Sequence, residues 1–227
     1  MLDALLTPID QYCERTGPEA WSEPINALTN LAFIAAGLWG LREARLNDAG
    51  WAPTALAWWV VAIGVGSGLF HTFANRLTVW LDVLPIAIFT LAYTLFAIRR
   101  YLGFAWGPAI VVFLAFYAVA GVATALVPDG LRVATSGSTG YLPAFLALAV
   151  FGLWVAARGH PAGRYLIAAA AVFVVSVTFR SLDGHLCDAV PIGTHFLWHT
   201  LNGAMLALLL AAAARHGSAR AMARADR

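Results

Sequence analysis

Long apolar runs separated by short polar connections dominate the pattern of hydrophobic and polar positions along this chain. The runs cover residues 24–42, 52–74, 79–98, 105–127, 141–157, 163–180 and 193–214. Most of them reach the roughly 20 residues that an α-helix needs to cross a bilayer. The shortest, at 141–157, can span if it is extended or tilted. The pattern therefore predicts seven transmembrane helices.

The connections between these runs are too short to separate two domains. Residues 1–23 form a polar, acidic segment in which Pro8, Gly17 and Pro18 interrupt regular structure. Pro24 follows at the first predicted helical position, where proline is favoured. We expect an all-α membrane protein with an extracytoplasmic N-terminal segment at 1–23, a seven-helix bundle at 24–214 and a basic tail at 215–227.

Composition supports an integral membrane protein. Of the 227 residues, 61% are hydrophobic and only 11% are charged, and the mean hydropathy is +0.75. A soluble domain of this size could not bury so much apolar surface. The chain contains no lysine, which excludes a retinal Schiff base. The formal net charge of +2 is small, and we expect no nucleic-acid partner.

The distribution of arginine predicts the orientation in the membrane, because basic residues concentrate on the cytoplasmic side. The N-terminal segment and the second, fourth and sixth connections hold four arginines. The remaining connections and the tail hold ten: Arg42, Arg45, Arg99, Arg100, Arg158, Arg164, Arg215, Arg220, Arg224 and Arg227. The C-terminus is therefore predicted to be cytoplasmic and the N-terminus to lie outside.

The two cysteines, Cys13 and Cys187, both fall in polar segments on the predicted outer side. That side is oxidising, so a disulfide formed there can persist. We predict a Cys13–Cys187 bridge, which would tie the N-terminal segment over the start of the last helix.

Two histidines at the start of the last apolar run are the first sign of chemistry. His195 and His199 lie four residues apart, so on a helix their rings share one face and can converge. Two imidazoles in so apolar a segment are costly unless something binds them. A metal ion is the leading candidate.

Three more polar residues are expected at the same depth near the outer face. His71 ends the second run, Ser67 lies one helical turn before it, and Asp82 lies near the start of the third run. Each alone has a structural explanation: an interfacial histidine, a packing serine, and a carboxylate that caps a helix or pairs with Arg76. Their coincidence at one level of the bundle favours a functional site.

Three histidines and a water are the open tetrahedral arrangement of catalytic zinc, although imidazole also suits other transition metals. Zinc would activate the water and polarise a carbonyl. Asp82 would then serve as general base, and Ser67 could donate a hydrogen bond to the oxyanion. The set predicts hydrolysis of an amide or ester of a lipid within the membrane.

This arrangement resembles the alkaline ceramidases, whose wider superfamily of seven-transmembrane zinc hydrolases includes the adiponectin receptors. The resemblance is carried by Ser67-x-x-x-His71, Asp82 and His195-x-x-x-His199. At the N-terminus, Cys13-Glu14 and Glu23-x-x-Asn26-x-x-Thr29-Asn30 resemble the ceramidase entry into the first span. It implies zinc at His71, His195 and His199, catalysis by Asp82 and Ser67, and a Cys13–Cys187 bridge.

The resemblance also implies a calcium site at Asp10, Glu14 and Glu23, since calcium prefers hard oxygen ligands. From the residues alone, these acids are equally well explained as a solvated acidic segment. The stretch departs from the family pattern: Gln11-Tyr12 replaces a single residue, Thr16 replaces a ligand asparagine, and Glu23 lies two residues nearer to the cysteine.

The predicted function is cleavage of the amide bond of ceramide, or of a related N-acyl lipid, to a fatty acid and an amine. The compact, lysine-free chain suggests a bacterial inner-membrane protein whose site lies near the periplasmic face. Two alternatives stay open: a seven-helix receptor or transporter with a structural metal, and a haem-binding electron-transfer protein that uses these histidines as axial ligands.

Overall fold

The computed structural model describes residues 2–217, and across these residues it is helical, without strands. Seven helical segments are long and apolar enough to cross a membrane, which confirms the predicted bundle. Short elements lie at the N-terminus and in the connections: α1 (Leu2–Leu5), α7 (Asp129–Ala134), η1 (Ser138–Tyr141) and η2 (Asp183–His185). The spans are α2 (Pro24–Thr29) with α3 (Leu31–Leu46), α4 (Trp51–Phe73), α5 (Arg76–Arg100), α6 (Trp106–Ala125), α8 (Leu142–Ala157), α9 (Ala162–Leu182) and α10 (His195–His216).

The helix bounds differ from the predicted apolar runs where polar groups satisfy the helix ends. The fifth span is lengthened by η1, which extends it to Ser138–Ala157. The third span starts at Arg76, because Asn75 and Thr78 form a capping box that satisfies its first backbone N–H groups. The first span runs on to Leu46, and Glu43 near its end pairs with Arg215 at 2.8 Å.

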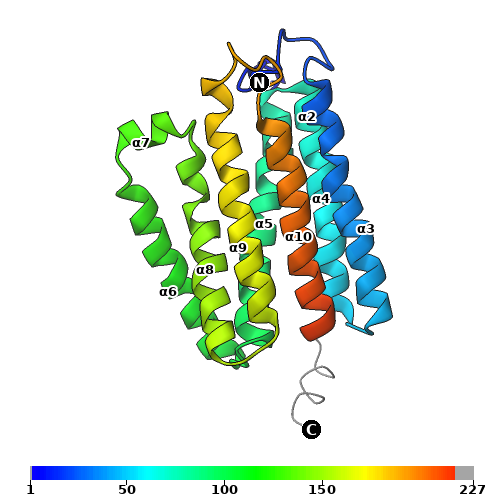
Figure 1. Ribbon diagram of the computed structural model, residues 1–227, viewed down its shortest axis with the longest axis vertical. Helices are drawn as coiled ribbons and strands as arrows, with labels where there is room; N and C mark the ends of the chain where they lie inside the picture. Colours follow the sequence, from blue (N-terminus) through cyan, green and yellow to red (C-terminus); the bar gives the residue numbers. More distant parts are fainter. Residues whose placement is uncertain (1, 218–227) are drawn as a thin grey trace.

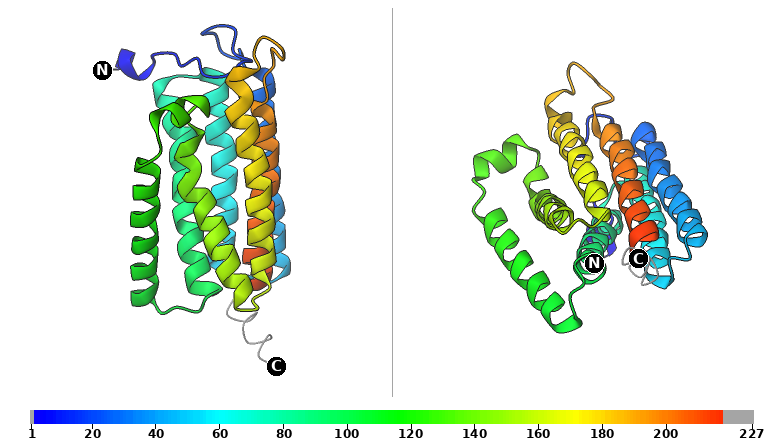
Figure 2. Two further views of the ribbon diagram at one scale, coloured as in Figure 1. Left: turned by 60° about the vertical axis from the view of Figure 1, so that its left-hand side comes forward. Right: turned by 60° about the horizontal axis from the view of Figure 1, so that its bottom comes forward.

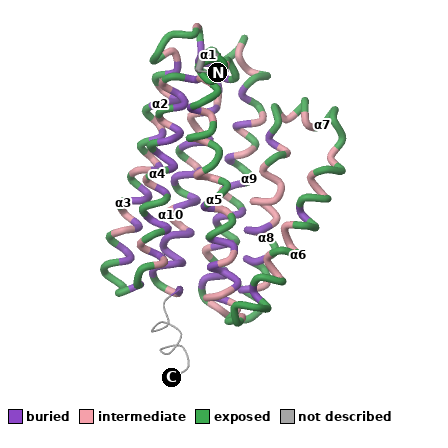
Figure 3. Tube along the Cα trace, turned by 180° about the vertical axis from the view of Figure 1, so that it is seen from behind, coloured by how far each residue is buried: buried purple, intermediate pink, exposed green. Residues whose placement is uncertain are grey.

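The spans stand side by side, and α10 lies between α9 and α3 (Figure 1). It packs most extensively against these two helices, while α3 also packs closely on α4. The right-hand view of Figure 2, in which the lower end of the bundle is turned forward, shows α6 at the periphery. There α6 packs less extensively, chiefly against α5 and α8. Burial follows this arrangement: α10 is largely buried, whereas α6 is mostly exposed (Figure 3).

Glycines allow two close helix contacts that position polar side chains. A Cβ added to Gly66 would lie 2.0 Å from the carbonyl oxygen of Leu81, so the α4 and α5 backbones touch there. Ser67 and Asp82 are the next residues on the two helices. On the other side of the bundle, a Cβ at Gly203 of α10 would lie 2.8 Å from the Cβ of Ala32 of α3.

The N-terminal segment lies across one end of the bundle. The Ile9 N–H donates to the carbonyl of Ala74 at 2.7 Å, and the Trp21 N–H donates to that of Thr72 at 3.1 Å. The predicted disulfide is present: Cys13 and Cys187 are joined with an S–S distance of 2.08 Å. The segment is thereby held over the ends of α4 and α10. Of the predicted basic tail at 215–227, residues 218–227 lie outside the described residues.

Candidate metal centre

Three histidines from two distant parts of the chain meet at the end of the bundle covered by the N-terminal segment. His71 comes from the last turn of α4, and His195 and His199 come from the first turns of α10. All three are buried, and one ligand nitrogen of each lies within 4.8 Å of the others. Within residues 2–217, they are the one group of three or more such side chains close enough to hold a metal ion.

The tautomer of His71 is fixed by a carboxylate. Its Nδ1 lies 2.6 Å from Oε2 of Glu23. Because an ionised carboxylate only accepts hydrogen bonds, Nδ1 must carry the proton. The Nε2 atom is then unprotonated, and it is buried without a hydrogen-bond partner. A ring nitrogen held in this state is suited to bind a metal ion.

His199 is oriented in the same way by a hydroxyl. Its Nδ1 lies 2.9 Å from Oγ1 of Thr29, whose own proton is directed to the carbonyl of Ile25 at 2.8 Å or of Asn26 at 3.1 Å. Thr29 therefore accepts from Nδ1–H, which leaves Nε2 of His199 as a second buried nitrogen without a partner.

His195 is positioned through its backbone and through one face of its ring. The Asp183 carboxylate accepts from the backbone N–H groups of Thr194 at 2.6 Å and His195 at 2.8 Å, so it caps α10. Gly193 precedes this cap with φ +63°, and a Cβ there would lie 2.1 Å from Oδ1 of Asp183. The Tyr12 ring stacks on His195 with the ring centroids 3.6 Å apart.

The Glu23 carboxylate also accepts hydrogen bonds from other side chains. Arg15 pairs with its Oε1, and the Asn26 side-chain amide donates to Oε2 at 3.2 Å. Burial alone would raise the pKa of Glu23, but the hydrogen bonds from His71 and Arg15 and the positive charge of Arg15 hold this pKa below its ordinary value. Arg15 also donates to the carbonyl of Gly17 at 2.9 Å, which fixes the N-terminal loop beside the site.

Asp82 and Ser67 lie together beside the histidines. The half-buried Asp82 carboxylate is hydrogen-bonded to the Ser67 hydroxyl, and it lies close to His71 and to the positive charge of Arg180. The contact follows from the approach of α4 and α5 at Gly66. The structure thus brings together all five residues that the sequence nominates for a hydrolytic centre.

Arg180, one of the four arginines counted on the predicted outer side, is a buried cation. It donates to the carbonyl of Ser136 at 3.1 Å and to Oγ of Ser138 at 2.8 Å. Its guanidinium lies over the Tyr141 ring, 5.2 Å from the centroid, and 5.8 Å from that of Trp198. It therefore ties the connection before α8 to the bundle and adds positive charge near Asp82.

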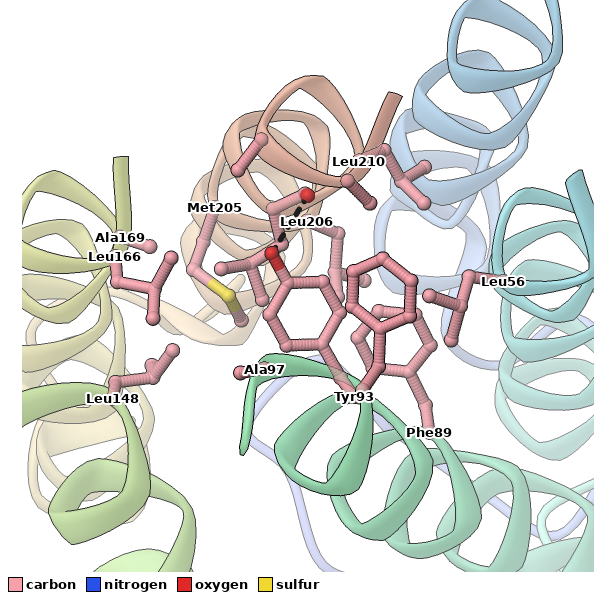
Figure 4. Packing of buried hydrophobic residues seen from close by; sticks show 14 of the residues in the cluster. Leu56, Phe89, Tyr93, Ala97, Leu148, Leu166, Ala169, Met205, Leu206 and Leu210 are labelled. Atoms are coloured by element: carbon pink, nitrogen blue, oxygen red, sulfur yellow. Dashed lines mark hydrogen bonds between the residues drawn. The ribbon is translucent and has the colours of Figure 1, made fainter. Parts of the chain in front are cut away.

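An apolar pocket lies within the bundle, alongside α5 and α10. The space in it that protein atoms do not fill is about 780 Å³, part of which is open to the outside. Its lining runs along α5 from Ile86 to Ala97 and along α10 from Trp198 to Leu209, with further side chains from α3, α4, α8 and α9. Figure 4 shows several of these side chains, among them Tyr93, Leu148 and Met205. A long apolar pocket of this kind suits a hydrocarbon chain.

The three acids predicted to bind calcium do not form a second group of ligands among residues 2–217. Asp10 is exposed. The Glu14 carboxylate caps α2, accepting from the backbone N–H groups of Ile25 at 2.6 Å and Asn26 at 2.8 Å. Glu23 is bound to His71 and Arg15. Calcium binding at these residues stays a prediction.

The residues that support the histidines were not predicted from the sequence. Glu23, Asn26 and Thr29 follow one another at intervals of three residues at the entry to an apolar span. That spacing places them on one helix face, which was a usable signal for polar groups that face a site. Asp183 left no comparable signal, because its role depends on the fold of the connection between α9 and α10.

The arrangement of the rings bears on the haem alternative. The ring centroids of His71, His195 and His199 are 4.6 to 5.1 Å apart, and the rings are tilted or perpendicular to one another. A macrocycle held by two axial histidines must fit between their rings, and these rings already pack against each other. The geometry suits a single ion.

The fold and the site together define an integral membrane protein with seven helices and a buried three-histidine centre near an apolar pocket. A protein-family model described as Ceramidase matches residues 11–224, nearly the whole chain. The chain belongs to the Ceramidase family, which confirms the predicted resemblance and indicates a hydrolase that acts on a lipid. A search of curated proteins found no match.

Proposed function

We propose that this protein is a zinc-dependent amidohydrolase that cleaves the amide bond of ceramide, or of a related N-acyl lipid, into a fatty acid and an amine. One observation carries the proposal: three buried histidines converge beside Asp82 and Ser67, two of them with Nε2 freed by a fixed tautomer. Family membership supports hydrolysis of a lipid.

The donor set fits zinc. His71, His195 and His199 would supply three neutral nitrogen ligands, which is the number found in catalytic zinc sites that keep one position open. Bound there, zinc would polarise the substrate carbonyl and make a water molecule acidic near neutral pH. Glu23 and Thr29 hold two of the ligands in the required tautomer.

Asp82 would act first as the general base and then as the general acid of the reaction. Its carboxylate takes a proton from the water as the water oxygen forms a bond with the amide carbon. The same proton then passes to the amide nitrogen as the C–N bond breaks. The products are a carboxylic acid and a free amine, and Asp82 returns to its ionised form.

Ser67 would serve in two stages. With Asp82 ionised, the Ser67 hydroxyl donates its single proton to the carboxylate and holds it in place. Once Asp82 has accepted a proton, it is a weaker acceptor, so the Ser67 hydroxyl is free to donate to the developing oxyanion.

The orientation inferred from arginine would place this centre near the outer face of a bacterial inner membrane, with the N-terminus outside and the C-terminus in the cytoplasm. The disulfide supports this orientation, because it needs an oxidising compartment. The acyl chain would extend from the metal centre into the apolar pocket.

The test combines metal analysis with product formation by purified protein in lipid nanodiscs. We expect about one zinc per chain, lost in His199→Ala. Ceramides, N-acyl ethanolamines and ornithine lipids serve as substrates, and a chelator should abolish fatty-acid release from those that are cleaved. Asp82→Asn should keep the zinc and lower the rate by about 10²- to 10⁴-fold.

Two results would overturn the proposal. Zinc that stays stoichiometric in His199→Ala would mean that the metal binds elsewhere. Zinc bound as expected, but with no product from any of these lipids, would favour a receptor or transporter with a structural metal.

A further inference from the structure

A hydrogen-bonded tyrosine lies at the deep end of the apolar pocket. Tyr93 of α5 lines the pocket together with Leu209 of α10. The Tyr93 hydroxyl donates to the carbonyl of Leu209 at 2.8 Å, a contact drawn as a dashed line in Figure 4. The same hydroxyl lies 3.1 Å from that of Tyr101. These bonds hold the ring across the space between the two helices.

The region beyond Tyr93 is filled by other aromatic rings. The Phe96 centroid lies 5.9 Å from that of Tyr93 and 5.5 Å from that of Tyr101. Gly217, just after α10, packs so closely that a Cβ there would lie 2.4 Å from the Phe96 ring. Neither Phe96 nor Tyr101 lines the pocket. Beyond Tyr93 on α5, only the small side chains of Thr94 and Ala97 line the pocket. The Tyr93 ring is therefore the bulky part of the floor, with packed side chains beneath it.

The distance from the metal centre to this floor corresponds to a hydrocarbon chain of defined length. His199 and Leu209 are ten residues apart on α10, or about 15 Å at the rise of an α-helix. A polypeptide, with three bonds per residue, extends by about 1.2 Å per bond. About twelve to thirteen bonds fit into this depth, so an acyl chain of about 14 carbons would reach from the reacting carbonyl to Tyr93.

We propose that Tyr93 sets the upper limit of acyl-chain length for this protein. The inference rests on the proposed function, in that the acyl group is taken to occupy the pocket. A saturated chain of about 14 carbons would fill the pocket, and each further methylene would have to displace the ring or leave the carbonyl out of register with Asp82.

Hydrolysis of N-acyl lipids that differ only in acyl length provides the test. The wild type should lose kcat/KM about tenfold or more between chains of about 14 and about 18 carbons, since one misplaced methylene already changes rates measurably. Tyr93→Ala and the milder Tyr93→Leu should raise the limit by about four carbons, the equivalent of one helical turn of 5.4 Å. Tyr93→Phe keeps the ring and should keep the limit.

A variant that should shorten the accepted acyl chain distinguishes a change of pocket depth from a general loosening of packing. Met205 lines the pocket one helical turn before Leu209 on the same face of α10. Met205→Trp should lower the limit by about four carbons. Phe104→Ala removes a ring of similar size that packs on Trp154 outside the pocket, with the ring centroids 5.7 Å apart, and it should change neither the basal activity nor the limit.

Competition by free fatty acids of 12 to 20 carbons against a fluorescent fatty acid, measured on the intact protein, separates this inference from the proposed function. If Tyr93→Leu binds longer fatty acids than the wild type does, Tyr93 is supported as the floor of the pocket even if no lipid is hydrolysed. A limit that stays unchanged in both Tyr93→Ala and Tyr93→Leu overturns it. An equal shift in Phe104→Ala also overturns it, because general loosening would then be the cause.

Discussion

The metal centre and the apolar pocket are held together by different kinds of contact. At the end covered by the N-terminal segment, His71, His195 and His199 are each fixed by a specific partner: Glu23, Asp183 or Thr29. Deeper in the bundle, the pocket is lined mostly by hydrocarbon and aromatic groups, and its polar contact between α5 and α10 is Tyr93 on Leu209.

The difference follows from what each region has to hold. A metal ion needs nitrogen atoms in defined positions, so each imidazole needs a directional bond that fixes its ring. A hydrocarbon chain makes only non-directional contacts, so the pocket needs shape and volume but little polar specification. We therefore expect the metal centre to be sensitive to small changes and the pocket to tolerate them.

The largest effect is expected from the disulfide, which stabilises the polar end as a whole. Cys13→Ser combined with Cys187→Ser should lower the free energy of unfolding by about 2–5 kcal/mol, because the bridge closes a loop of 174 residues in the unfolded chain. Thermal unfolding in detergent measures the loss, and reduced wild type should match the double variant. Equal melting temperatures for all three proteins would refute the effect.

A smaller effect at the same end should separate metal affinity from stability. Glu23→Gln keeps the side-chain volume but removes the charge that fixes His71, so zinc affinity should fall about 10- to 100-fold. Competition with a chelator of known affinity measures this. The control is Glu43→Gln, a buried acid paired with Arg215 at the other end of the bundle. Equal zinc affinity in both variants would contradict the assignment of Glu23.

The smallest effect is expected in the pocket. Leu148 lines it from α8, and Leu148→Met conserves volume and polarity, so it should cost less than about 1.5 kcal/mol of stability. Zinc affinity should be unchanged in the chelator competition. A clear loss of zinc in this variant would mean that the pocket and the metal centre are not separable in the way described.

The fold was largely predictable, because a bilayer accepts only helices or closed barrels, and runs of about 20 apolar residues leave helices as the choice. The helix ends were less predictable. The start at Arg76 depends on the capping box of Asn75 and Thr78, and the start at His195 depends on Asp183, twelve residues away in another element. Hydropathy does not register either interaction.

The residues of the site were also predictable from the sequence, since histidines and a carboxylate are costly in apolar segments and therefore stand out. Their convergence needed only the alternation of helix directions, which places His71, Asp82 and His195 at one depth. The side chains that surround Glu23 and Asp82 were not predictable in the same way. Arg15 looks like part of a polar loop, and Arg180 like the end of a helix, until the folded chain places them beside Glu23 and near Asp82.

The sequence by itself determined the number of spans, the histidines, Asp82 and Ser67, and the pairing of the two cysteines, because each depends on local pattern or on the side of the membrane. Only the tertiary structure decided which ring nitrogens are free, which side chains hold them, and how deep the pocket runs before it meets Tyr93. These properties depend on distances of a few ångströms between helices remote in sequence, and such distances are set by packing rather than by periodicity.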